Sequence, residues 1–199
     1  MDNVTGGIEV FKAEDKLIMS NYRPVSVLPV FSKILERLMY NRLLKYLESN
    51  SLLSSNQFGF REKHSTYMAL ASLVDNITNE LEQKRHCVGI FIDLSKAFDT
   101  LDHRILLDKL NLYGVRGLAN AWFTSYLSNR QQFVQIGSEH SEMQFINCGV
   151  PQGSILGPLL FILYINDLVH VSKLAKIIMF ADDTNFFFSE EDIAKLNYD

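Results

Sequence analysis

The chain has 199 residues, of which 47% are hydrophobic and 21% charged, and its formal net charge is −4. This composition is that of an ordinary globular protein and excludes a disordered chain, while the mildly negative charge argues against a general nucleic-acid-binding surface. The longest apolar stretch is too short to span a membrane and the N-terminus lacks a signal pattern, so we expect an intracellular protein without a membrane anchor, in nucleus or cytoplasm.

The first part of the chain is predicted to contain two extended segments followed by two helices. Residues 1–7 are expected to form a disordered start, because Gly6 and Gly7 supply little order. The extended segments are expected at residues 8–11 and 21–28, the second as a sheet edge, and the helices at residues 32–48, capped by Ser32, and 66–84.

The second part of the chain mixes strands and helices irregularly. A strand over residues 87–92 leads to Asp93, and Asp102 is placed to cap the next helix. The remaining elements are expected at residues 103–112, 119–127 and 159–169 as helices, and at 132–136 and 143–148 as a hairpin. We therefore predict an α+β fold, with an antiparallel sheet backed by helices. Cys87 and Cys148 lie in apolar runs and are expected to be buried, reduced thiols.

Three carboxylates stand beside apolar segments. Asp93 follows a run that reads as a buried strand, and Asp182 with Asp183 separates two apolar runs, as at a hairpin turn. Burying three acids is costly unless a cation lies among them, and Mg²⁺ prefers such oxygen ligands. The alternative is that the adjacent aspartates only form a turn and that Asp99 or Asp102 only caps a helix.

The run from Gly149 to Pro158 is rich in glycine and proline and carries Gln152 and Ser154. Such a loop lets backbone approach a ligand closely, although it could also be a plain connector.

Five blocks of sequence resemble, in order, those of non-LTR (LINE-like) retrotransposon reverse transcriptases. They are NYRPVSVL from Asn21, QFGFREKHSTYMA from Gln57, FIDLSKAFDTLD from Phe91, GVPQGSILGP from Gly149 and FADD from Phe180. A lone pair of aspartates would be weak support, whereas five ordered blocks are specific.

The resemblance implies a right-hand polymerase fold, with fingers at about residues 8–85 and a palm at 86–199. By position, Asp93, Asp182 and Asp183 match the family's catalytic metal ligands for two Mg²⁺ ions, which Mn²⁺ could replace. The family's thumb would follow residue 199, so the chain is expected to be truncated after the palm hairpin.

The resemblance also implies a set of substrate-binding residues. Phe98 matches the aromatic residue that packs under the incoming sugar and excludes a 2′-hydroxyl. Lys12 and Arg23 match basic residues that hold the triphosphate, and Gln152 and Gly153 match positions beside the nascent base pair. One further residue, Arg61, is expected at the template or nucleotide.

The implied function is RNA-directed DNA polymerisation, with an RNA template, a DNA primer and dNTPs as partners. The thumb and an endonuclease are expected in the parent protein. The alternatives are an inactive relict or domesticated fragment that acts as an RNA-binding or interaction module, and an RNA-copying RNA polymerase, which the bulk of Phe98 disfavours.

Overall fold

The computed structural model describes residues 4–11, 18, 22–94, 96–136 and 138–192. The chain divides into two units that interleave along the sequence: Met1–Ser49 with Lys96–Tyr164, and Asn50–Ser95 with Ile165–Asp199. Each unit contains helices and a sheet, which confirms the predicted α+β class. Neither unit coincides with the predicted fingers or palm, and that division stays a prediction.

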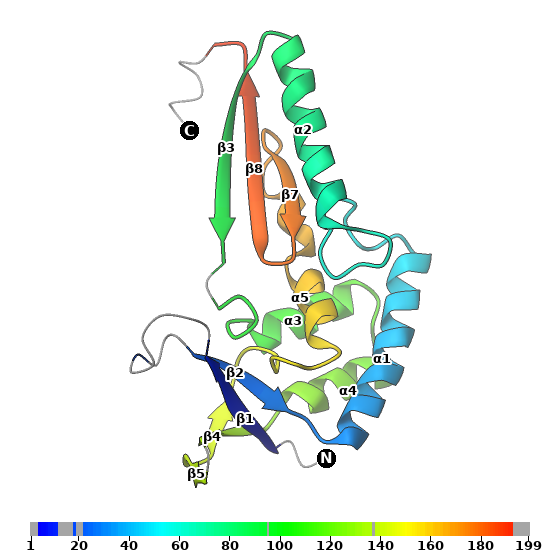
Figure 1. Ribbon diagram of the computed structural model, residues 1–199. Helices are drawn as coiled ribbons and strands as arrows, with labels where there is room; N and C mark the ends of the chain where they lie inside the picture. The colour runs from blue at the N-terminus through cyan, green and yellow to red at the C-terminus, as the bar shows by residue number, and fades with distance from the viewer. Residues whose placement is uncertain (1–3, 12–17, 19–21, 95, 137, 193–199) are drawn as a thin grey trace. The chain divides into compact units, whose positions relative to one another are not determined.

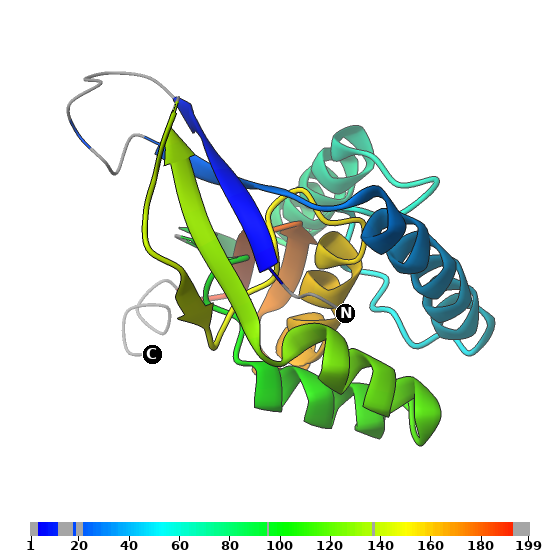
Figure 2. The ribbon, with the colours of Figure 1, turned by 90° about the horizontal axis from the view of Figure 1, so that it is seen from below.

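The sheet of the first unit has β1 (Val4–Phe11) in its interior. β1 pairs antiparallel with β2 (Tyr22–Val27) and parallel with β4 (Arg130–Ile136), and Figure 2 shows β1 and β4 side by side. β4 also pairs with the short strands β5 (Glu139–His140) and β6 (Gln144–Ile146). The edge position of β2 confirms the predicted edge segment.

The start of β1 differs from the prediction. We expected residues 1–7 to form a disordered start, but the strand begins at Val4 and pairs with β4 from its first residue. Gly6 lies under the ring of Phe133, where an added Cβ would be 3.2 Å from the nearest ring carbon. The absence of a side chain at this position thus serves strand packing.

The described residues of the first unit also form four α-helices: α1 (Val30–Ser49), α3 (His103–Leu112), α4 (Leu118–Leu127) and α5 (Gly157–Tyr164). The apolar side chains of α5 are buried almost without interruption. Those of Leu106, Leu110, Phe123 and Leu127, in α3 and α4, are also buried. α3 begins where predicted, because the Asp102 carboxylate accepts hydrogen bonds from two backbone amides of its first turn. The predicted Ser32 cap is wrong, since α1 begins at Val30.

In the second unit one helix covers a three-stranded antiparallel sheet. The strand order is β3 (His86–Asp93), β8 (Asp183–Glu190) and β7 (Lys176–Phe180). α2 (Thr66–Glu82) runs alongside this sheet in Figure 1, and its Ala69 is buried with Ile178 and Phe187. A short 3-10 helix (Asn166–His170) precedes β7.

Two further expectations concern the cysteines and the membrane. Both cysteines are free thiols, as predicted. Cys148 is exposed and Cys87 is half-buried, so the predicted burial of the two side chains was wrong. Cys148 lies beyond the end of β6, where its backbone bridges that of Asp102, and Cys87 is in the edge strand β3. Among the described helices, none has the length and apolar character needed to cross a membrane.

Candidate active site

The three predicted metal ligands all belong to the second unit. Asp93 is the last residue of β3 and Asp183 is the first residue of β8, and the two are directly opposite in the antiparallel register. Residues opposed in this way have Cα atoms about 4.5 to 5.5 Å apart. Asp182 is in the two-residue turn that joins β7 to β8. The fold therefore gathers at one end of the sheet residues that are about 90 positions apart in sequence.

The burial predicted for these acids was wrong. Asp93 and Asp183 are exposed and Asp182 is half-buried, because β3 is an edge strand and not the buried strand that its apolar composition suggested. Desolvation is therefore no argument for a cation. Like charges directly opposite on neighbouring strands still repel each other, and a cation between them relieves this repulsion.

The donor set suits a hard cation such as Mg²⁺, because carboxylate oxygens are the ligands that this ion prefers. Within the described part of the chain, no three His, Cys, Asp or Glu side chains are grouped as a complete metal site. The described part of the proposed site is therefore the opposed pair of Asp93 and Asp183, with Asp182 directly before Asp183 in the chain.

The turn that carries Asp182 has an unusual backbone. Ala181, its first residue, has a φ of +56°, as the first central residue of a type II′ hairpin turn requires. For a residue with a Cβ, a sparsely populated backbone conformation of this kind is unfavourable by about 1 to 3 kcal/mol of conformational free energy. The side chain of Gln57 hydrogen-bonds both backbone polar groups of Ala181. No role was predicted for Gln57 from the sequence, although it begins one of the five blocks.

A pocket of about 380 Å³ opens beside the carboxylates in the second unit. Asp93 and Asp183 line it together with Phe91 of β3 and Leu70 of α2. The acids therefore border a space that could admit a ligand, and this space has one apolar wall.

Among the remaining predicted residues that the structure describes, Arg61 lies in the second unit and the others lie in the first. Phe98 is half-buried and its ring stacks on that of Phe161 in α5, with centroids 4.7 Å apart. Because Phe161 is only 2% exposed, the ring of Phe98 has a fixed support. The structure thus leaves Phe98 partly accessible, as the predicted contact with a sugar requires.

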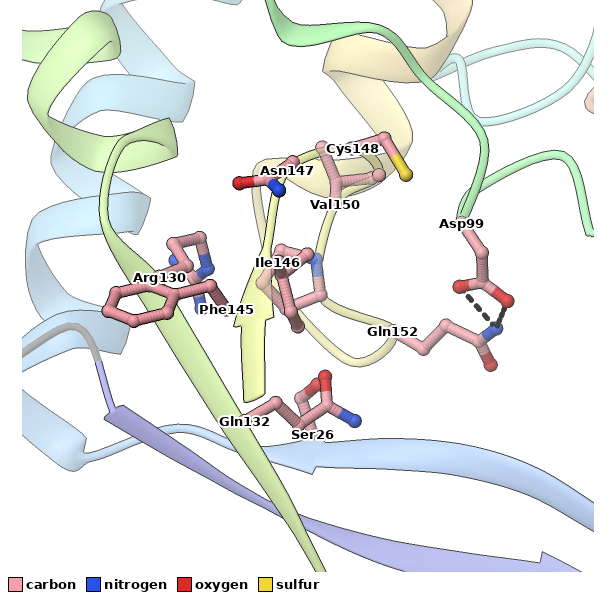
Figure 3. Close-up of a pocket in the computed structure, with 12 residues that line it drawn as sticks. Ser26, Asp99, Arg130, Gln132, Phe145, Ile146, Asn147, Cys148, Val150 and Gln152 are labelled. Carbon is pink, nitrogen blue, oxygen red and sulfur yellow. Dashed lines mark hydrogen bonds between the residues drawn. The ribbon is translucent and has the colours of Figure 1, made fainter. Parts of the chain in front are cut away.

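Gln152 contacts the residue that follows Phe98. Its Nε2 donates to both carboxylate oxygens of Asp99, at 3.0 and 3.1 Å, and Figure 3 shows the two side chains pointing toward each other. They line a pocket of about 480 Å³ in the first unit, together with Ser26, Gln132 and Arg130. The Phe98 and Gln152 segments are therefore joined by a direct polar contact.

The glycine-rich loop approaches the chain's own backbone closely. A Cβ on Gly149 would lie 2.7 Å from the carbonyl oxygen of Asp99, and Gly149 has a φ of +80°. The backbone amides of Gly149 and Val150 donate to the carbonyl oxygens of Leu101 and Phe98. Gly149 and Val150 therefore fix the loop against the Phe98 segment, and close approach of a ligand stays a prediction.

Arg61 lies in the second unit and holds a loop, since its Nη1 donates to the carbonyl oxygens of Ser54 and Gln57. The backbone of Arg23 is in β2 opposite Val10. Gly153 has a φ of +97°, and the neighbouring carbonyl of Gln152 accepts a hydrogen bond from the Ser26 amide. Lys12 falls outside the described residues.

Comparison with known proteins identifies the family. The family model described as "Reverse transcriptase (RNA-dependent DNA polymerase)" matches residues 11–199. Two Drosophila melanogaster proteins are similar: the probable RNA-directed DNA polymerase from transposon BS, 35% identical over 85% of this chain, and that from transposon X-element, 37% identical over 82%. This chain covers 19% and 18% of those two proteins, or about a fifth of their length.

Solved structures show the same fold at low sequence identity. Telomerase from Candida tropicalis in complex with the TWJ fragment of telomeric RNA superposes with a TM-score of 0.63 at 15% identity, over 96% of this chain and 37% of that chain. Apo telomerase from the same organism, truncated from its C-terminal domain, gives a TM-score of 0.62 at 14% identity, over 96% of this chain and 45% of that chain. The family-model match over residues 11–199 and the similarity to the two Drosophila proteins place the chain in the reverse transcriptase (RNA-dependent DNA polymerase) family, alongside the proteins of non-LTR retrotransposons.

Proposed function

We propose that this chain carries the nucleotide-adding centre of an RNA-directed DNA polymerase, with Asp93, Asp182 and Asp183 as the ligands of two Mg²⁺ ions. The observation that supports it most directly is the opposition of Asp93 and Asp183, with Asp182 in the adjoining turn, within a chain of this family.

In the proposed reaction, the oxygen of a primer 3′-hydroxyl forms a bond to the α-phosphorus of a dNTP. The bond between the α-phosphorus and the bridging oxygen to the β-phosphate breaks, pyrophosphate leaves, and the hydroxyl proton passes to solvent. Bound Mg²⁺ would lower the pKa of the 3′-hydroxyl and stabilise the charge on the leaving pyrophosphate. The RNA template selects the nucleotide by base pairing, so the protein needs contacts to backbone and shape.

The other predicted residues receive roles in binding and selection. Phe98, supported by Phe161, would exclude a 2′-hydroxyl from the sugar position. Gln152 and Gly153 would lie beside the nascent base pair. Arg23 and Lys12 would bind the triphosphate, since cationic side chains suit phosphate oxygens, and Arg61 would act near the template while it holds its loop.

The carboxylates are tested by primer extension on an RNA template with Mg²⁺ and dNTPs, using a protein that contains these 199 residues. Asp182→Asn should reduce the rate at least about 100-fold. Mutating groups that only orient metal ligands already lowers activity by up to about 100-fold, and loss of a ligand itself should lower it at least as much. The matched control is Asp75→Asn, which makes the same charge change at an exposed position of α2. Equal rates for the two variants would contradict the assignment, and a folded chain without any turnover would favour an inactive relict.

Selection of the sugar is tested separately. Phe98→Val should lower the preference for dNTPs over ribonucleotides by roughly 10- to 200-fold, the range expected when a pocket loses a small steric difference. Phe31→Val removes the same atoms from a side chain of α1 that is 82% exposed, and should leave the preference unchanged. The measurement is the ratio of kcat/KM for the two nucleotides, and an unchanged ratio in Phe98→Val would remove Phe98 from this role.

A further inference from the structure

The side chain of Gln57 lies next to the proposed metal ligands, and both of its polar atoms are hydrogen-bonded. It is 1% exposed. Its Oε1 accepts from the Gly59 amide at 2.7 Å and from the Ala181 amide at 3.0 Å, and its Nε2 donates to the Ala181 carbonyl at 3.3 Å. One carboxamide therefore satisfies both backbone polar groups of the residue just before Asp182, in a region from which water is excluded.

The backbone around Gln57 reinforces this contact. Gln57 forms a parallel bridge with Met179 of β7, in which the Phe58 amide donates to the Met179 carbonyl and the Met179 amide to the Asn56 carbonyl, both at 2.8 Å. Gly59 lies directly on the turn, because an added Cβ would be 2.1 Å from the backbone nitrogen of Ala181. The segment 56–59 thus bridges to β7 at Gln57 and ends against the turn.

This arrangement constrains the direction in which the Asp182 side chain projects from the backbone. The Ala181 carbonyl belongs to the planar peptide group that joins Ala181 to Asp182, so fixing that oxygen fixes the plane to which the Asp182 Cα is attached. The left-handed φ of Ala181 is unfavourable by itself and needs surrounding contacts to persist. The Gln57 side chain supplies hydrogen bonds that hold both polar groups of Ala181.

We propose that Gln57 is a positioning residue of the metal site: it holds the Ala181–Asp182 peptide so that the Asp182 carboxylate is oriented for a divalent cation. The inference rests on the proposed function for the identity of the site, but the hold on the turn can be measured without any metal.

The metal-free test is amide hydrogen exchange of the 199-residue chain. Gln57→Met keeps the length and volume of the side chain and removes both hydrogen-bonding atoms. Exchange of the Ala181 amide should accelerate about tenfold, while amides in the middle of β8 exchange as before. If the Ala181 amide exchanges at the original rate in Gln57→Met, the turn does not depend on Gln57 and the proposal is wrong.

The second test is the affinity for Mn²⁺ alone, followed by electron paramagnetic resonance. Gln57→Met should weaken binding by about 10- to 100-fold, the range for groups that orient metal ligands. The matched control is Asn166→Leu, which removes another buried carboxamide of the same unit; it is 7% exposed and bonds the backbone of Leu52 and Ser54 instead of the turn. Urea unfolding of both variants checks that their stabilities are comparable. Equal loss of Mn²⁺ affinity in both would mean a general structural effect and would overturn the proposal.

A milder variant covers the case in which Gln57→Met fails to fold. Gln57→Glu keeps the size and the Oε1 acceptor, and it replaces the Nε2 donor to the Ala181 carbonyl by a second carboxylate oxygen. The added negative charge by itself favours cation binding, so a lower Mn²⁺ affinity in this variant can come only from lost orientation. A higher affinity would contradict the proposal.

One more variant separates this proposal from the proposed function. If Asp182→Asn leaves Mn²⁺ affinity unchanged, the metal site itself is wrong. In that case the exchange rate of the Ala181 amide in Gln57→Met still decides whether Gln57 holds the turn.

Discussion

At the scale of single residues, Glu36 is an acidic side chain that is buried, although it belongs to α1, whose sequence has the pattern of an amphipathic helix. Its side chain is 1% exposed, and its two oxygens accept from the Tyr126 hydroxyl at 2.6 Å and the Ile155 amide at 2.7 Å. Burial, and then the nearby Glu36 charge, raises the pKa of Tyr126 far above its ordinary value, while burial lowers the pKa of Arg130. Glu36 therefore connects α1 to α4 and to the glycine-rich loop.

Replacing this carboxylate should be strongly destabilising. We expect Glu36→Leu to lower the free energy of unfolding by about 3 to 5 kcal/mol, because the substitution leaves the buried groups around it without their anionic partner. Glu48→Leu, at an exposed position of the same helix, should change it by less than about 0.5 kcal/mol. Urea unfolding measures both. A cost for Glu36→Leu no larger than that of the control would show that the network adds no stability.

Residue-scale predictions succeeded where the cause is local and failed where it is not. The Asp102 cap could be predicted because the carboxylate and the amides it accepts from are within three positions of each other. Burial of Glu36 could not, since its partners are 90 and 119 positions away. The exposure of Asp93 was missed for the same reason, because composition does not distinguish an edge strand from a central one.

At the scale of elements, the C-terminal end of α2 is attached to its sheet by charged groups. Glu80 is 8% exposed, and its carboxylate accepts from Lys176 Nζ in β7 at 2.6 Å and lies 3.2 Å from Arg85 Nη1. Arg85 also donates to the Ser189 carbonyl in β8 at 2.7 Å. The hydrogen bond from Lys176, more than any other contact, lowers the pKa of Glu80 below its ordinary 4.5.

This lowered pKa makes the contribution of Glu80 dependent on pH. A carboxyl that is more acidic in the folded than in the unfolded chain adds stability above its unfolded pKa, and this stability is lost as pH falls through the folded pKa. Glu80→Gln should therefore lower the urea midpoint at pH 7, and the difference from the unchanged chain should shrink progressively below about pH 4.5. Glu82→Gln, exposed on the same helix, serves as control. A difference that is constant from pH 7 to pH 3 would contradict the role of the ionised carboxylate.

Helices and hairpins were largely predictable as elements, because caps, periodicity and turns lie within short stretches of sequence. The bounds of α3 and the hairpin that carries Asp182 follow from such local signals. The parallel pairing of β1 with β4 joins segments more than 120 positions apart, and no local pattern marks it. The contact of Gly59 with the turn is similar: the glycine indicated a tight backbone, but its partner Ala181 could not be read from the sequence.

At the scale of the whole molecule, the chain passes between its two units three times, at residues 49–50, 95–96 and 164–165. Neither unit is therefore one continuous segment. The passage at residues 95–96 falls between Asp93 and Phe98. A proposed metal ligand and the proposed sugar contact therefore belong to different units, although they share one block of sequence. A cut at the predicted fingers–palm boundary would divide the second unit, leaving α2 in one fragment and its sheet in the other.

The edge position of β3 also affects how the chain behaves at high concentration. Among the described strands, β8 is the only partner of β3, so the other side of its backbone is available to another strand. Phe91 is 69% exposed and Ile90 48%, and the run from Cys87 to Ile92 contains no charge or proline to block intermolecular pairing. Aggregation through added strands is therefore the hazard to guard against when the chain is purified, and a lysine in place of Ile90 is the simplest protection that leaves the carboxylates untouched.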